Sequence, residues 1–523
     1  MRTVGALPSL RNSRNPLVSV AVVALALLLA YQAAETILSG DLTNFGYAGV
    51  LVCMAVAIIA ILNDWRRGVY MLMTWILFED FARKFLGNNM AIYFVKDLLV
   101  LILYLSFFRS RAVRRVGVFS IPFRLSLLVF FWFAFLQVFN PASTSIFYGI
   151  LGIKVYFLYV PLIYVGYTFV HSQEDLLRFF SFICVLIIIV AGLGIAQSII
   201  GPSFLNPAQL QEDISQLSHT YRVAPISGLM AYRPTSVFVS AGRFQDFLVV
   251  AWLISLGFGG YLLLGSRQGR QVAFTAIGTV ATASLMCASR GVFMWNTGIA
   301  LIIAAGFLWG APWRQRETTR VLRLIQRAAF SVGIGIVLVL TIFPEELGSR
   351  LAIYSETLMP SSAASELVHR TQTYPLQQLG FAFDHPRWPY GYGMGTCTLG
   401  GQYVVRIMHA EPMSVGVESG FGNLIIELGI VGLVLWIVLG FSITLSAWEV
   451  AKELKGTRWF PLAFATFLFA FILFFPMTYT SFSAYQDFVI NSNLWLLIGI
   501  LYRLRTFPKL IRIAQNQAIS RQA

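Results

Sequence analysis

The sequence predicts an all-α polytopic membrane protein with about 12–14 transmembrane helices and one large loop. Of its 523 residues, 57% are hydrophobic and only 12% are charged, about half the charged fraction of a soluble domain. Its apolar runs are about 17–25 residues long, the length of a helix that crosses a bilayer, whereas the strands of a membrane β-barrel alternate over about 10 residues. Composition and run length therefore favour a helical bundle in a membrane.

Fourteen apolar segments are candidate spans. Arginines precede the first, but it is longer than the roughly 7–15 apolar residues of a signal peptide, so we interpret it as a retained span. The third is the least apolar, because its end carries four charged residues, Glu79, Asp80, Arg83 and Lys84. The segments cover residues 17–38, 47–62, 68–86, 91–108, 121–139, 147–170, 179–200, 246–264, 271–287, 291–310, 328–343, 421–447, 459–478 and 486–502.

The lysines and arginines predict how these spans are oriented. Counted from a cytoplasmic N-terminus, the inner connections are rich in arginine, for example 109–115 and 314–327, whereas outer turns such as 39–46 and 140–145 contain no basic residue. The positive-inside rule therefore places both termini in the cytoplasm. The same bias explains the net charge of +15 without nucleic acid as a partner.

Two long polar segments then lie outside, 201–245 and 344–420. The second divides the chain into spans at 1–343, a large outer loop at 344–420, and the last spans with a short cytoplasmic tail at 421–523. Loops of this length are uncommon and usually functional. The four cysteines have no metal-ligand spacing, and we expect neither a metal nor a cofactor.

Four ionisable residues lie inside apolar runs: Lys96, Asp97, Lys154 and Glu427. Such residues are costly in a membrane and normally face the bundle interior or a wet cavity. One interpretation is mutual neutralisation, for instance of Lys154 by Asp97 or Glu427. The other is a polar cavity that opens toward the large loop, because all four lie toward the outer ends of their predicted spans.

Four arginines lie on the outer side, against the positive-inside rule: Arg222, Arg233, Arg243 and Arg290. A guanidinium group is permanently charged and binds two oxygens at once, which suits a phosphate. Contact with lipid headgroups is the alternative for a single arginine. Arg290 stands in a tight turn with few other polar residues, so for this residue a phosphate ligand is the better explanation.

Four pieces of the chain carry a resemblance to a known family. Residues 78–85 and 93–97 hold Phe-Glu-Asp-Phe-Ala-Arg-Lys-Phe and Tyr-Phe-Val-Lys-Asp, 233–238 hold Arg-Pro-Thr-Ser-Val-Phe, and 289–291 hold Ser-Arg-Gly. The last piece is Gly-Tyr-Gly-Met-Gly-Thr at 391–396, with Glu-Ser-Gly at 418–420 and Glu-Leu-Gly-Ile-Val-Gly-Leu at 427–433. In this order they resemble the O-antigen ligase and polysaccharide polymerase superfamily, and the first piece is similar to its exopolysaccharide polymerase branch.

The sequence departs from the motifs of that superfamily at two places. Ala241-Gly242 stands where Pro-Asn often follows the arginine stretch, and His409 is followed by alanine rather than by the asparagine typical of ligases. The departure at His409 favours a polymerase over a ligase, which stays open as the alternative.

The resemblance implies a GT-C-like glycosyltransferase in the bacterial inner membrane. Its donor would be a polyprenyl-pyrophosphate-linked oligosaccharide at the periplasmic face, and its large loop would be periplasmic. An acceptor sugar hydroxyl would attack the anomeric carbon, and the lipid pyrophosphate would leave without metal or nucleotide. Membrane lipids and a chain-length regulator are the further partners that it implies.

We assign roles to residues on that basis. Arg290 and Arg233, and after them Arg243 and Arg222, would stabilise the leaving pyrophosphate. Glu418 or His409 would be the general base, with Glu411 and His369 as weaker candidates. Aromatic residues of the loop would contact sugar rings or pack within a turn: Trp388, Tyr390 and Tyr392.

A different class of protein also fits the composition, namely a transporter or flippase of lipid-linked sugars. Intramembrane lysine and aspartate residues would suit it. Transporters often consist of two related halves, whereas the loop at 344–420 has no counterpart in the first half of this sequence. We therefore prefer the interpretation that the protein is a glycosyltransferase.

Overall fold

The computed structural model describes residues 42–86, 90–206, 220–265, 269–310, 341, 343–398, 400–401, 404–405 and 416–507. In these residues the protein is a helical bundle, and the only strands are the three-residue β1 (Tyr221–Val223) and β2 (Met230–Tyr232), which pair antiparallel. The predicted all-α class is confirmed. The predicted spans 17–38 and 328–343 lie outside the described residues, apart from the end of the latter.

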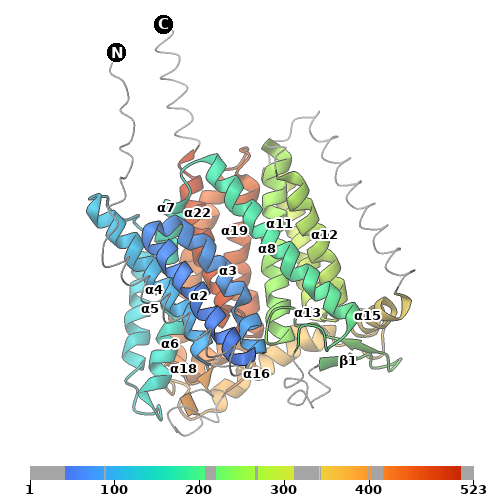
Figure 1. Ribbon diagram of the computed structural model, residues 1–523. Helices are drawn as coiled ribbons and strands as arrows, with labels where there is room; N and C mark the ends of the chain where they lie inside the picture. Colours follow the sequence, from blue (N-terminus) through green and yellow to red (C-terminus); the bar gives the residue numbers. More distant parts are fainter. Residues whose placement is uncertain are drawn as a thin grey trace.

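The helices follow the predicted apolar segments. Figure 1 shows most of them side by side, running from one end of the bundle to the other. They are α2 (Leu42–Asn63), α3 (Trp65–Phe85), α4 (Met90–Val113), α5 (Arg124–Gln137), α6 (Ile146–Phe157), α7 (Leu162–Phe169), α8 (Gln173–Ile200), α11 (Ala241–Gly265), α12 (Arg270–Met286), α13 (Arg290–Gly310), α18 (Gly420–Glu453), α19 (Phe460–Ile472) and α22 (Phe488–Leu504). Short elements connect α19 to α22: η2 (Leu473–Met477), α20 (Thr478–Thr480) and α21 (Ser483–Gln486).

Six segments among the described residues are long and apolar enough to cross a membrane, a smaller number than the fourteen predicted. They are Ile146–Phe169, Gln173–Ile200, Ala241–Gly265, Arg290–Gly310, Gly420–Glu453 and Phe460–Thr480. Among the remaining helices, α5 and α22 have only 14 and 17 residues, and α3 carries four buried charged residues. A membrane-embedded bundle is thus supported, whereas fourteen spans stay a prediction.

Side-chain caps fix several helix starts. Asp64 accepts the N–H of Arg66 at the start of α3, and Ser172 forms a reciprocal cap with Asp175 at the start of α8. Ser419 caps α18, and Asp487 accepts two N–H groups at the start of α22. These oxygens satisfy N–H groups that have no partner within the helix.

Arginines gather at one end of the bundle, which we call the basic end. Arg66 contacts His171 (2.6 Å), Arg503 donates to the carbonyl of Val170 (3.0 Å), and Arg458 donates to Gln173 (2.6 Å). Connections that are far apart in sequence therefore meet there, as the positive-inside prediction requires of connections on one side. Which side of a membrane this end faces stays a prediction.

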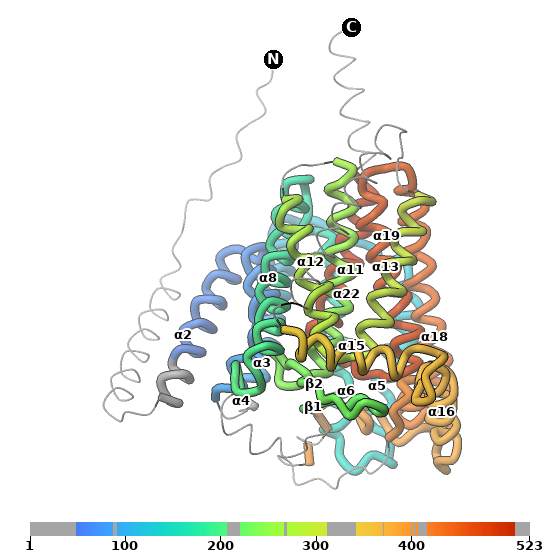
Figure 2. The backbone as a smooth tube through the Cα atoms, turned by 90° about the vertical axis from the view of Figure 1, so that its right-hand side faces the viewer, coloured from blue at the N-terminus to red at the C-terminus, as the bar shows by residue number. Residues whose placement is uncertain are grey.

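The opposite end, which we call the loop end, carries the short elements. Within 344–420 the chain forms α15 (Pro344–Leu358), the π-helical turn η1 (His369–Thr373) and α16 (Tyr374–Asp384). In Figure 1 these elements lie with β1 at the lower end of the bundle, and Figure 2 shows α15 running across the bundle rather than along it. Pro344 in the first turn, with two following glutamates, suits a helix start.

Two glycines let α7 and α22 approach closely. A Cβ at Gly499 would lie 2.2 Å from the carbonyl oxygen of Ile163, and one at Gly166 would lie 2.2 Å from that of Leu496. Close approach at small residues is a common way for helices to associate in membranes.

Replacing Gly499 by alanine should therefore lower the free energy of unfolding by about 1–3 kcal/mol, because backbone atoms would have to separate. Thermal unfolding in detergent measures this change. Gly298 of α13 is the matched control, because a Cβ there meets nothing within 4 Å and alanine has the better helix propensity. Equal transition midpoints for the two variants would contradict the prediction.

Candidate functional site

Two groups of charged residues lie at the loop end. The first, which we call the ionic network, joins the end of α3 and the start of α4 to α6, α11 and α22. The second, which we call the arginine pair, consists of Arg233 after β2 and Arg290 at the start of α13. The ionic network contains Glu79, Asp80, Arg83, Lys84, Lys96, Asp97, Lys154, Arg243 and Asp487.

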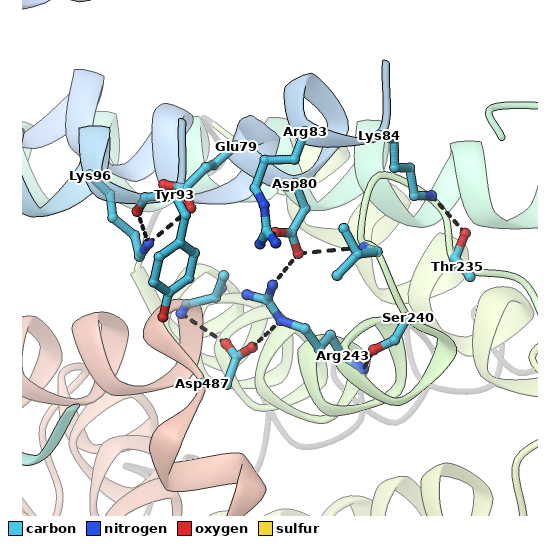
Figure 3. A network of polar contacts seen from close by, with 12 residues as sticks. Glu79, Asp80, Arg83, Lys84, Tyr93, Lys96, Thr235, Ser240, Arg243 and Asp487 are labelled. Atoms are coloured by element: carbon cyan, nitrogen blue, oxygen red, sulfur yellow. Dashed lines mark hydrogen bonds and ion pairs between the residues drawn. The ribbon is translucent and has the colours of Figure 1, made fainter. Parts of the chain in front are cut away.

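The ionic network is buried and internally paired (Figure 3). Lys96 Nζ lies 2.9 Å from Glu79 Oε1, and both side chains are almost fully buried. Arg83 Nη1 lies 3.1 Å from Asp80. Lys84 donates to the hydroxyl of Thr235 and the carbonyl of Ser236, each at 2.7 Å. α3 is thereby fastened to the segment that follows β2.

Arg243 is the centre of this network. Its Nε donates to Asp487 (2.7 Å) and its Nη1 pairs with Asp80, so it joins α11 to α3 and α22. Its guanidinium also lies 4.2 Å from the ring centroid of Phe488. The two carboxylate partners occupy the fork that we expected to hold pyrophosphate. The structure therefore gives Arg243 a bundle-joining position.

Lys154 pairs with Asp97 (2.6 Å), the first of the two partners that we considered. Its Nζ and that of Lys96 also lie over the ring of Tyr93, 4.4 and 3.2 Å from the centroid, which adds cation–π attraction. The network thus neutralises charges between helices. For Lys96, Asp97 and Lys154 the observed contacts match the neutralisation alternative.

Glu427, the other partner considered for Lys154, is bound elsewhere. Its carboxylate is fully buried and accepts from the hydroxyl of Tyr156 (2.7 Å), the hydroxyl of Thr398 (2.9 Å) and the N–H of Cys397 (2.8 Å). Hydrogen bonds to neutral donors satisfy this buried carboxylate. Glu427 therefore holds the last part of the loop against α6 and α18.

The glycine-rich turn at 391–395 packs on the part of α18 that carries Glu427. The N–H groups of Tyr392 and Gly393 donate to the carbonyls of Ile426 (2.7 Å) and Glu427 (3.0 Å), which α18 leaves without helical partners because it breaks at Gly429 (φ 71°). A Cβ at Gly391 would lie 2.5 Å from the carbonyl of Glu427. The glycines thus permit contact between two backbones, and no phosphate loop is formed.

The arginine pair lies beside strained backbone. Ala288, two residues before Arg290, has φ 52°, and Ser236, three residues after Arg233, has φ 50°. Non-glycine residues in this conformation cost about 1–3 kcal/mol and are frequent at functional sites. Burial, and then the charge of Arg290, lower the pKa of the Arg233 guanidinium from its ordinary value. The two cations therefore act on each other.

The large loop reaches Arg290. Arg290 Nη1 lies 2.8 Å from Glu366 Oε2, and the two side chains are 14% and 37% exposed. Ser289 donates to Gln245 of α11 (2.9 Å), which fixes the turn before Arg290. A guanidinium held in this way, against a partly exposed carboxylate, is suited to bind an anion if the anion replaces the carboxylate.

Arg350 of α15 supports both members of the pair, and the sequence analysis did not single it out. It is fully buried and donates to the carbonyls of Met286 (2.7 Å), Ser198 (3.3 Å) and Tyr232 (3.5 Å). Tyr232 precedes Arg233, and Met286 lies four residues before Arg290. One side chain of the loop thus ties together the backbones that carry the two arginines. A basic residue in an acidic helical segment was the only sequence signal.

The remaining predicted site residues are spread over the loop end. Arg222 lies in β1 and is partly exposed. Glu418 is exposed, and its N–H donates to Gln378 of α16 (3.0 Å). His369 is exposed in η1. His409 and Glu411 lie outside the described residues.

The three loop aromatics differ in their surroundings. Trp388 packs edge to face on Phe383, with ring centroids 5.3 Å apart, and Tyr392 is partly buried against the core. Tyr390 is 76% exposed. The packing alternative therefore fits Trp388 and Tyr392, and only Tyr390 presents a largely open ring.

In the part of the chain that the structure describes, no three His, Cys, Asp or Glu side chains are grouped as a metal site would need. In the structure Arg290 thus contacts Glu366, and Arg350 holds the backbone near both Arg290 and Arg233, whereas Arg243 is paired with Asp80 and Asp487. A comparison of the chain with family models and with curated proteins finds no match.

Proposed function

We propose that this protein is a membrane glycosyltransferase that joins polyprenyl-pyrophosphate-linked oligosaccharide units at its loop end. The observation that carries the proposal is the arginine pair at the end of an apolar bundle: Arg350 holds the backbone near both arginines, and the loop carboxylate of Glu366 contacts Arg290. A lipid-linked pyrophosphate bound here would place its lipid chain beside the bundle and its phosphate charges at the arginine pair. The resemblance to polysaccharide polymerases supplies the reaction.

The proposed glycosyl transfer would use the arginine pair and a general base. The oxygen of the acceptor hydroxyl forms a bond to the anomeric carbon of the donor, the bond from that carbon to the pyrophosphate breaks, and a base takes the hydroxyl proton. Charge develops on the leaving pyrophosphate, where Arg290 and Arg233 would stabilise it. Glu418 or His409 would be the base. The basic end would then face the cytoplasm of a bacterium, and the loop end the periplasm.

The test is a reconstitution of the purified protein in detergent with lipid-linked repeat units. Longer lipid-linked glycans should form without an ion gradient and should be absent without protein. Transfer to a lipid core or protein acceptor, with no elongation, would indicate the ligase instead. If neither product forms, the proposal is wrong.

The general base is testable in the same assay. Glu418→Gln or His409→Gln should lower the elongation rate by about 10²–10⁴-fold, the usual contribution of a general base. Glu345→Gln is the matched control, because Glu345 is an exposed carboxylate of the same loop. If both variants elongate glycans at the rate of this control, the base lies elsewhere.

The ionic network favours one second candidate, a transporter of lipid-linked sugars, because buried lysines and carboxylates between helices occur in ion-coupled carriers. In vesicles, a transporter would move the lipid-linked sugar only when an ion gradient is imposed. Elongation of glycans in detergent, where no gradient exists, is the result that separates the enzyme from the transporter.

A further inference from the structure

Helix α16 belongs to the large loop, is only 11 residues long, and does not cross the bundle. Its residues form three stripes in which members are seven positions apart. Pro375 and Ala382 are buried, Leu376 and Phe383 are exposed and apolar, and Gln377 and Asp384 are exposed and polar. At 3.6 residues per turn these stripes follow one another about 100° apart around the helix. The helix therefore has separate buried, apolar and polar sides.

The buried side packs on the start of α18. A Cβ at Gly422 of α18 would lie 3.3 Å from the carbonyl of Gln378 and 3.4 Å from Ala382. Since this side points to the bundle, the apolar stripe lies beside the bundle surface and the polar stripe points away from it. Phe381 is exposed as well, beyond the polar stripe, on the same side as the half-buried Tyr374 seven positions before it.

The depth of α16 in a membrane follows from its contact with α18. α18 has 34 residues but breaks at Gly429. Its continuous part, from Ile430 to Glu453, is about 36 Å long, whereas the hydrocarbon core of a bilayer is about 30 Å thick. The charged turn at Glu449–Glu453 marks one edge of the core, and counting about 20 residues back from Ala447 places the other edge near Leu428. Gly422 precedes the break at Gly429 by seven residues, so it lies within about 11 Å of that edge whichever way residues 420–428 run. This range includes the lipid headgroups.

The bundle exposes apolar side chains near this level. α18 exposes Val431, Val434 and Val438, and the chain after α5 exposes Phe139. Gln137 at the end of α5 donates to the carbonyl of Tyr390, and Trp388 packs on Phe383. The loop turn that carries Trp388 and Tyr390 thus links the end of α5 to α16. Aromatic residues such as these are typical of the membrane interface.

We propose that α16 is an interfacial helix, whose Leu376–Phe383 stripe enters the lipid leaflet at the loop end while its Gln377–Asp384 stripe faces water. The occupant of the apolar stripe is lipid, because α16 packs on the start of a candidate span at headgroup depth, and α5 and α18 also expose apolar side chains. Such helices enter the boundary between headgroups and acyl chains by about 5–10 Å. The large loop is thereby fixed at the membrane surface, whatever reaction it takes part in.

The test is a comparison of two neighbouring positions on the full-length protein in vesicles. Leu376→Cys and Gln377→Cys are made in a Cys53→Ser background, since Cys53 is an exposed native cysteine, and are labelled with an environment-sensitive fluorophore. The label at 376 should be quenched several-fold more by phospholipids with a shallow nitroxide than by those with a nitroxide at the bilayer centre. The label at 377 should instead be quenched by aqueous iodide. Phe383→Cys should repeat the result of 376.

Three other outcomes would overturn the inference. Quenching of both labels by iodide would place α16 in water. Protection of the 376 label from both quenchers would mean that a second copy or another protein covers the stripe. Deep quenching would make α16 part of the hydrocarbon core. Unchanged thermal transitions of the unlabelled variants show that each position was tested in the folded protein.

Discussion

Replacing Asp80 by alanine should lower the free energy of unfolding by about 3–5 kcal/mol, the usual cost of removing one partner from a buried ion pair. Asp80 is 1% exposed and contacts Arg83 (3.1 Å) and Arg243 at once. Its loss would leave Arg83, whose side chain is 4% exposed, without the carboxylate with which it is paired in the network. Thermal and denaturant unfolding in detergent measure the change.

An exposed ion pair provides the matched control. Glu174 and Arg178 are 2.6 Å apart, but their side chains are 70% and 67% exposed. Such a pair contributes about 0–1 kcal/mol, so Glu174→Ala should unfold almost as the parent protein does. A double-mutant cycle of Asp80→Ala with Arg243→Met would isolate the coupling between the two residues. Equal effects of Asp80→Ala and Glu174→Ala would mean that the ionic network does not stabilise the bundle.

Replacing Arg290 by alanine should lower kcat/KM for elongation by about 10²–10³-fold, the usual effect of removing one charge-stabilising donor at the reacting group. The same change should affect stability little, because the pair with Glu366 is partly exposed. Arg290→Lys should recover only part of the activity, since lysine keeps the charge but loses the fork. Elongation assays with varied donor concentration separate the two constants.

Two further variants make this result specific. Arg178→Ala removes an arginine from the start of α8, near the basic end, and should leave elongation unchanged. Glu366→Gln removes the carboxylate that competes with the donor for Arg290, so it should lower KM rather than raise it. Elongation by Arg290→Ala within a few-fold of the parent rate would remove this residue from the proposed mechanism, and the arginine pair with it.

The sequence predicts the helices well because their signal is local. Runs of apolar residues fixed the position of α8, α11, α13 and α18 within a few residues, and basic connections fixed which ends lie together. The number of spans was less predictable. An apolar run of 14–17 residues forms a helix in the bundle, as α5 and α22 show, but its length does not decide whether it crosses a membrane.

The partners of the charged residues could not be predicted, because they depend on packing between distant segments. Lys154 pairs with Asp97 and not with Glu427. Glu427 instead accepts a hydrogen bond from Tyr156, which is 271 positions away in the sequence. Arg243 looked like a free cation next to a span, yet it lies between Asp80 and Asp487. That Arg233 and Arg290 bind one pyrophosphate stays a prediction.

The contact between the glycine turn and α18 has a consequence for biogenesis. The turn at 391–398 is synthesised before α18, but it provides two of the three donors that satisfy Glu427. Until those donors and Tyr156 are in place, α18 would carry a carboxylate into lipid, at a cost of about 2.5–3.5 kcal/mol for an acidic residue at the centre of a helix and less near its end. We therefore expect α18 to enter the membrane late, once the loop that precedes it in the sequence has folded. One acidic residue would then set the order of insertion.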